Sequence, residues 1–135
     1  TAIILADRSF GPAKPSAWAE AVGAAFDGFE ADCVVAESNQ GGDMVAAVLR
    51  AARPGLPVKL VRASRGKLAR AEPVAMLYAA GRVRHAGRFP ALEDQMCAFG
   101  SPEAGSQSPD RVDALVWAVT ELLMTPRGAP RLRPL

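Results

Sequence analysis

The chain has 135 residues, the size of one domain, with 50% apolar residues, 22% charged residues and a formal net charge of +2. This composition is typical of an ordinary globular protein and excludes the disordered and fibrous classes. No apolar run approaches the roughly 20 residues of a membrane span and no secretory leader opens the chain, so we expect a cytoplasmic protein.

The first half of the chain alternates predicted strands and helices. Apolar runs bounded by turn residues predict strands over residues 2–6, 34–36 and 57–63. Helical spacing of apolar residues, with Pro and Gly near the boundaries, predicts helices over residues 15–28 and from about 42 to 53. The first helix should turn five residues towards the core: Trp18, Val22, Ala25, Phe26 and Phe29.

The second half is mostly helical. Helices are predicted over residues 68–80 and 91–99, with an edge strand between them at residues 82–86. The last helix has the clearest start, with Ser108 as N-cap, Pro109 at the first helical position and Asp110 in the first turn, and it runs to about residue 124. Its buried arc should hold six residues: Val112, Leu115, Val116, Val119, Leu122 and Leu123.

Alternating strands and helices predict an α/β fold with a mixed central sheet and helices on its faces. The middle of the sheet should be parallel, with an antiparallel piece where residues 3–6 or 82–86 add at an edge. We assign residues 1–125 to one domain and residues 126–135 to a Pro/Arg-rich tail that does not continue the last helix.

The cysteines and the histidine limit which kinds of catalytic or metal site the chain can form. Cys33 and Cys97 are far apart in sequence, without CxxC spacing, and we interpret both as buried thiols in a reducing compartment. His85 is the only histidine, which excludes a site with two imidazoles and makes a zinc hydrolase a poor match. Any catalytic chemistry therefore falls to carboxylates.

Glu37 and Asp113 are the strongest carboxylate candidates. Glu37 ends a buried strand, where α/β folds build active sites, and could be a metal ligand, a general base or a polar residue leaving the sheet. Asp113 lies at the edge of the buried arc of the last helix. Burying a carboxylate there costs free energy unless a cation or a network of hydrogen-bond donors pairs with it. The alternative to a functional role for Asp113 is a structural ion pair with Arg111 or another basic residue. Asp110 lies further towards solvent, where it either complements the helix dipole or assists the site.

Together, Glu37 and Asp113 suggest a divalent-metal site. Hard oxygen ligands without imidazoles match Mg²⁺ or Mn²⁺ rather than zinc, and two such ions roughly 4 Å apart could serve phosphodiester cleavage. A carboxylate pair of this kind still allows a binding module without catalysis.

Polar and basic residues near these carboxylates could hold a phosphate backbone. They are Asn39 and Gln40 at the strand tip, followed by Gly41-Gly42, and Arg65, Lys67 and Arg70 after the third strand. The glycine turn could instead simply join strand to helix, and Lys67 could be an ordinary surface lysine. A nucleotide-binding domain using this turn is a weaker alternative, since no Walker-type lysine or G-x-G-x-x-G spacing follows a strand. Two further basic clusters could also bind a polyanion: Arg82, Arg84, His85 and Arg88, and Arg127, Arg131 and Arg133.

Four motifs follow one another in order along the chain. They are Ala36-Glu37-x-Asn39-Gln40-Gly41-Gly42-Asp43-Met44-Val45, Ala63-Ser64-Arg65-Gly66-Lys67 with Arg70-Ala71-Glu72-Pro73, Leu92-Glu93-Asp94-Gln95-Met96, and Ser108-Pro109-Asp110-Arg111-Val112-Asp113-Ala114-Leu115. In these motifs the sequence resembles the carboxy-terminal nuclease domain of the large terminase subunit of tailed phages and gene-transfer-agent-like prophages. The resemblance implies an RNase H-like, resolvase/integrase-like fold and metal-dependent cleavage of concatemeric double-stranded DNA during head packaging.

The resemblance also implies roles for individual residues. Glu37 matches the second acidic metal ligand, and Asp110 with Asp113 matches the acidic cluster that opens the last helix. Such domains usually begin with a strand bearing a first catalytic aspartate, whereas this chain opens at what resembles a later strand, with Asp7 as its only nearby acid. We therefore expect the chain as given to lack that aspartate and to cut weakly or not at all. An ATPase motor domain, a portal and a small terminase subunit are the implied partners.

Overall fold

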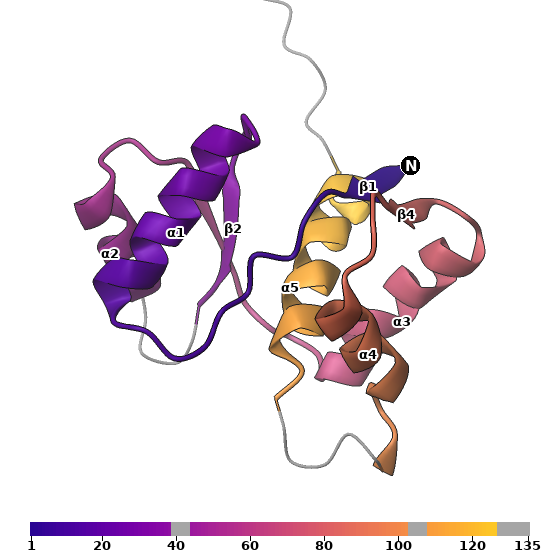
Figure 1. Cartoon of the computed structure of the whole chain (residues 1–135). Helices are drawn as coiled ribbons and strands as arrows, with labels where there is room; N and C mark the ends of the chain where they lie inside the picture. The colour runs from indigo at the N-terminus through magenta and orange to yellow at the C-terminus, as the bar shows by residue number, and fades with distance from the viewer. Residues whose placement is uncertain (39–43, 103–107, 127–135) are drawn as a thin grey trace, which may run out of the picture.

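The computed structural model describes residues 1–38, 44–102 and 108–126 as an α/β arrangement (Figure 1). Most of the predicted tail and the Asn39-Gln40-Gly41-Gly42 turn lie outside the described residues. Within them no helix combines the length and the apolar character of a membrane span. The elements in chain order are β1 (Ala2–Ile4), α1 (Pro15–Gly28), β2 (Val34–Glu37), α2 (Met44–Ala52), β3 (Val58–Val61), α3 (Lys67–Ala79), β4 (Val83–His85), α4 (Pro90–Ala98), α5 (Asp110–Val119) and η2, a π-helical turn (Thr120–Met124).

The described strands form two separate parallel sheets instead of one mixed sheet. β2 pairs with β3, with Val34 opposite Val58, and β1 pairs with β4, with Ala2 opposite Val83. The predicted antiparallel edge at residues 3–6 or 82–86 is therefore wrong. Several helices connect β1 to β4, so no tight hairpin imposes an antiparallel direction on them.

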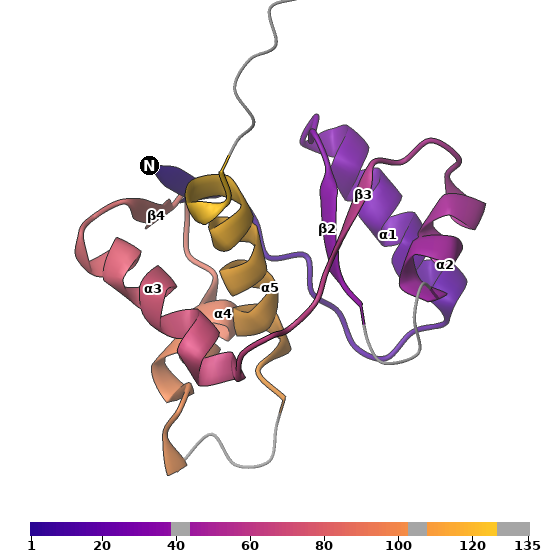
Figure 2. The same cartoon turned by 180° about the vertical axis from the view of Figure 1, so that it is seen from behind.

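The first half of the chain builds a β-α-β unit with its own core. α1 and α2 cover one face of the β2–β3 sheet, and α5 lies towards its other face, as both views show (Figures 1 and 2). Ala19, Leu49 and Leu56 are the buried centre of this core. Phe29 was expected in the core and is exposed, because it follows the last residue of α1 and lies outside the helical face.

The second half packs around α5. α3 and α4 both contact α5, and four of the six residues predicted for its buried arc are buried: Val112, Leu115, Val116 and Val119. Leu123 is partly buried against this core, whereas Leu122 is 49% exposed. A π-helical turn has more residues per turn than an α-helix, so η2 rotates Leu122 away from the expected direction.

Two further expectations are corrected. Cys33 and Cys97 are both exposed, because Cys33 precedes β2 and Cys97 lies on an outer face of α4. α5 begins at Asp110, so Pro109 takes the N-cap position. Ser108 donates its hydroxyl to the Asp110 carboxylate over 2.6 Å and caps no backbone amide of the helix.

Each of the two sheets has two strands, so every strand has one unpaired edge within the described part of the chain. The amides of Val34 and Ser38 donate towards β3, to the carbonyls of Pro57 and Val61. Since backbone groups alternate in direction along a strand, those of Val35 and Glu37 point to the opposite edge. β1 has a similar free edge, on the side away from β4.

Candidate functional site

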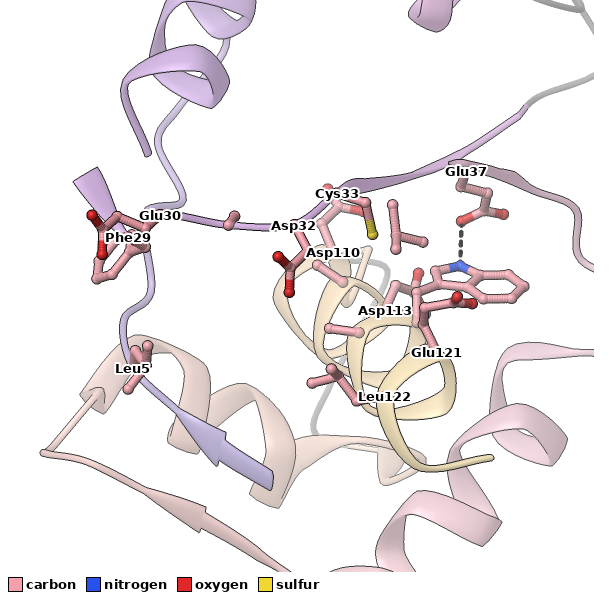
Figure 3. A pocket seen from close by; sticks show the side chains of 15 residues that line it. Leu5, Phe29, Glu30, Asp32, Cys33, Glu37, Asp110, Asp113, Glu121 and Leu122 are labelled. Carbon is pink, nitrogen blue, oxygen red and sulfur yellow. Dashed lines mark hydrogen bonds between the residues drawn. The ribbon is translucent and has the colours of Figure 1, made fainter. Parts of the chain in front are cut away.

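Glu37 is the last residue of β2, and its carboxylate reaches α5. Val34 and Val35 suit a strand because their side chains are β-branched, and the strand ends where polar residues follow. The Glu37 Oε2 atom accepts a hydrogen bond of 3.1 Å from the indole N–H of Trp117, marked by the dashed line in Figure 3. This bond joins residues 80 positions apart in the chain.

α5 carries Asp113 and Trp117 on the same face, because residues four apart in a helix lie one above the other. The Val112 amide, near the start of this helix, donates to Gln95 Oε1 over 2.9 Å, so α4 helps to fix the position of α5. Asp113 is 13% exposed, which places a carboxylate close to the core as the helical wheel predicts.

The partners of Asp113 come from the first turn of α3. Lys67 Nζ lies 2.7 Å from Asp113 Oδ2, and Arg70 Nη2 lies 3.9 Å from Asp113 Oδ1. Arg70 Nη1 also lies 3.8 Å from Glu37 Oε1. Lys67 and Arg70 are three residues apart and so share one side of α3. The ion-pair alternative for Asp113 is thus present, with Lys67 and Arg70 rather than Arg111 as partners.

Arg70 links the two acidic residues. Its guanidinium stacks on the Trp117 ring, with Cζ 4.8 Å from the ring centroid. Two carboxylates and two cations, Lys67 and Arg70, make the group electrically balanced, and each of the four carboxylate oxygens faces a cation or an N–H donor. Glu37 and Asp113, predicted to converge, are therefore held around one arginine.

An open pocket of about 640 Å³ lies between β2 and α5 (Figure 3). Its acidic lining residues are Glu30, Asp32, Glu37, Asp110, Asp113 and Glu121, and its apolar lining includes Val35, Ala114, Trp117, Ala118 and Leu122. Asp110 shares this pocket with Glu37 and Asp113 and accepts its hydrogen bond from Ser108. The pocket offers a concave surface next to the carboxylate pair.

The donor chemistry fits one hydrated Mg²⁺ or Mn²⁺. Such ions take one or two carboxylates together with water and substrate phosphate oxygens, and Glu37 with Asp113 offers two. No group of three or more His, Cys, Asp or Glu side chains in the described residues is arranged to hold a metal ion. Glu37 and Asp113 alone do not complete a metal site in the described residues, and their oxygens already face Lys67, Arg70 or Trp117.

The other predicted residues are not all near this group. Arg65 lies in the exposed loop before α3, and Asn39 and Gln40 fall outside the described residues. Asp7 belongs to a different contact, accepting from Arg111 Nε at 3.1 Å and from the Ser9 amide at 3.0 Å. Burial raises the pKa of Asp7, but the Ser9 hydrogen bonds and the Arg111 charge outweigh it, so this pKa lies below the ordinary value of 3.8.

Sequence reasoning missed Trp117 and Gln95. The position of Trp117, four residues after Asp113 on the same helix, was a signal that could have placed it at the site. Gln95 stands in one of the four motifs, but nothing in the sequence indicates that its side chain would accept from the amide of Val112.

Comparison with known families identifies the family of the chain. The model of the terminase RNaseH-like domain matches residues 2–122, which is nearly the whole chain. No curated protein and no solved structure matches the chain significantly. The matched range includes the two carboxylates and the two basic residues that pair with them: Glu37, Asp113, Lys67 and Arg70.

Proposed function

Because the chain belongs to the terminase RNaseH-like domain family, we propose that it is a divalent-metal-dependent endonuclease domain that hydrolyses double-stranded DNA during viral genome packaging. The observation that carries the proposal is the meeting of Glu37 and Asp113 around Arg70. The two carboxylates come from distant segments and converge on one side of a pocket. Such convergence is the arrangement that a metal-dependent nuclease requires.

In this proposal Glu37 and Asp113 hold the metal, with Asp110 assisting from the same pocket. When bound, Mg²⁺ or Mn²⁺ supplies charge stabilisation at the phosphate and lowers the pKa of a bound water. Arg65 and Lys67, both exposed, bind the phosphodiester backbone. Asn39 and Gln40 add neutral donors near the end of β2.

We extend the proposal to the partners that such a domain would serve. They are an ATPase motor domain in the same parent chain, a portal and a small terminase subunit, with the host cytoplasm as the place of action. These partners rest on the family membership.

Nicking of supercoiled plasmid DNA tests the proposal. A domain completed by the aspartate-bearing strand that the resemblance implies should nick DNA with Mn²⁺ and not with EDTA. In that domain Glu37→Gln should lower the rate by at least about 100-fold, because losing a metal ligand removes several kcal/mol of stabilisation. Glu20→Gln on the exposed side of α1 is the matched control and should leave the rate unchanged. Equal nicking by Glu37→Gln and the unchanged protein would contradict the proposal.

A DNA-binding or docking module without cleavage is the second candidate. It is favoured because, in the described ranges, no three acidic side chains are arranged to hold a metal ion together. If the chain is such a module, a gel shift should show DNA binding in EDTA, and neither the chain nor the completed domain should nick DNA in Mn²⁺. The endonuclease proposal predicts nicking by the completed domain under the same conditions.

A further inference from the structure

Arg70 and Trp117 form a stacked pair that is largely shielded from solvent. The Arg70 side chain is 10% exposed, and its guanidinium lies over the Trp117 ring. A cation stacked on an indole face is held more strongly when it is shielded from water. Arg70 is therefore a fixed part of the site and not a mobile surface arginine.

Both members of the pair hold Glu37. A guanidinium is a planar fork of N–H groups, so Arg70 can face Glu37 with one nitrogen and Asp113 with the other. Trp117 donates to the second oxygen of Glu37. Glu37 therefore has a hydrogen bond at one oxygen and a longer ion pair at the other.

One atom of Arg70 strengthens this interpretation. Nη1 is buried and has no hydrogen-bond partner among the described residues, although Glu37 Oε1 lies 3.8 Å away. A buried N–H without an acceptor is costly, so it favours the approach of the Glu37 carboxylate. The buried nitrogen thus favours a close contact between Arg70 and Glu37.

We propose that Arg70 and Trp117 are positioning residues that fix the orientation and separation of the Glu37 and Asp113 carboxylates. In this role Arg70 does not contact the DNA backbone, which differs from the sequence-based expectation for this residue. The inference rests on the proposed function, because a fixed carboxylate pair matters for binding a divalent cation and a phosphate. Arg70 acts through the carboxylates that it holds.

Lys67 provides a comparison on the same helix. It contacts the same Asp113 and carries the same charge as Arg70, but its side chain is 46% exposed. A lysine ammonium on a flexible chain can leave a carboxylate readily, unlike a stacked guanidinium. Replacing Lys67 should leave the orientation of the Glu37 carboxylate unchanged, whereas replacing Arg70 should disturb it.

The first experiment needs no metal. The chain has two tryptophans, so an ¹H–¹⁵N NMR spectrum shows two indole N–H signals, and Trp18→Phe identifies the one from Trp117. Glu37→Gln and Arg70→Lys should both shift the Trp117 signal, while Lys67→Met should leave it in place and the Trp18 signal should stay constant throughout. An unmoved Trp117 signal in Glu37→Gln and Arg70→Lys would overturn the proposal.

The second experiment measures Mn²⁺ affinity by calorimetry. Arg70→Lys and Trp117→Phe should each weaken binding by about 10-fold, the lower end of the effect seen when outer partners of metal ligands are lost. Lys67→Met should strengthen binding. Since Arg70→Lys keeps the charge, a purely electrostatic role predicts unchanged affinity for it, and that result would contradict positioning.

Comparison with Glu37→Gln separates the two proposals. If Glu37→Gln binds Mn²⁺ as well as the unchanged protein does, the proposed metal site fails, and the indole signals alone decide the role of Arg70 and Trp117. If Glu37→Gln loses Mn²⁺ while Arg70→Lys and Trp117→Phe keep full affinity, positioning fails and the metal site stands. Circular dichroism checks folding, and Trp117→Phe decides if Arg70→Lys does not fold.

Discussion

Lys59 on β3 and Glu121 in η2 form a two-pronged ion pair, with Lys59 Nζ 2.7 Å from both carboxylate oxygens. The pair joins the β-α-β unit to the helical half of the molecule. The hydrogen bond from Lys59 is the largest cause of the lowered pKa of Glu121, and it outweighs the opposing effect of burial. Ionised Glu121 is therefore favoured in the folded state.

Lys59→Met should lower the melting temperature slightly at pH 7. A lowered pKa gives stability that is complete above the unfolded value and is lost as the pH falls through the folded value, so the difference from the unchanged protein should vanish in acid. High salt should also reduce this difference in melting temperature, since the ion pair is partly exposed. Thermal unfolding followed by circular dichroism measures both effects, with exposed Lys14→Met as control.

Tyr78 should ionise at unusually high pH. Burial, with a smaller contribution from the charge of Glu93, raises the pKa of Tyr78 to about 12. Because the unfolded tyrosine ionises near pH 10, stability should fall as the pH rises from about 10 towards 12. Tyr78 is the only tyrosine, so ultraviolet absorbance reports it directly, and Glu93→Gln should move its midpoint downward. A midpoint near 10 in the folded protein would contradict this.

Leu49→Ala should destabilise the protein by about 2–5 kcal/mol. Leu49 is almost fully buried in the core of the β-α-β unit, and the substitution loses both transfer free energy and packing. Urea unfolding measures the change. Leu68→Ala makes the same chemical change at an exposed residue of α3 and should cost no more than about 0.5 kcal/mol.

Arg65→Ala should weaken DNA binding in a salt-dependent way. If Arg65 contacts one phosphate, the slope of log K against log salt should decrease in magnitude by about 1. Fluorescence anisotropy with a DNA duplex at several salt concentrations measures the slope. Arg84→Ala removes an exposed arginine of β4 from the second basic cluster, and an equal loss there would place the DNA on that side instead.

Asp113→Asn and Asp110→Asn should differ in nicking activity. Asp113 is ion-paired with Lys67 and with Arg70, and Arg70 also faces Glu37. Because Asp113 is a proposed metal ligand, its loss should reduce Mn²⁺-dependent nicking in the completed domain by about 100-fold or more. Asp110 accepts from Ser108 and should matter by less than about 10-fold if it only assists. An equal loss of nicking activity in both variants would show that Asp110 matters as much for cleavage as Asp113 does.

The sequence predicted the order of the helices and strands and the convergence of Glu37 with Asp113. Both depend on local patterns: helical and strand periodicity, a strand end and the edge of a helical wheel. It did not predict the direction in which β1 pairs with β4, because strand partners are set by tertiary packing. Nor did it predict that Leu122 turns outward, since that depends on a π-helical turn within an otherwise regular pattern.

The contacts of Arg70 in the candidate site could not be predicted from the sequence either. The role of Arg70 was inferred from its charge and its place in a basic cluster, and charge alone does not distinguish a phosphate partner from a carboxylate. Its position against Trp117 and Glu37 depends on how α3 packs on α5, which no spacing within either helix reveals.

The unpaired edge of β1 affects how the molecule behaves when concentrated. An open strand edge is a template on which a strand of another molecule can add, and charged residues usually guard against this. β1 consists of Ala2, Ile3 and Ile4, and Ile3 and the following Leu5 are exposed. Edge-to-edge association between copies should therefore begin at β1, and light scattering should rise with protein concentration.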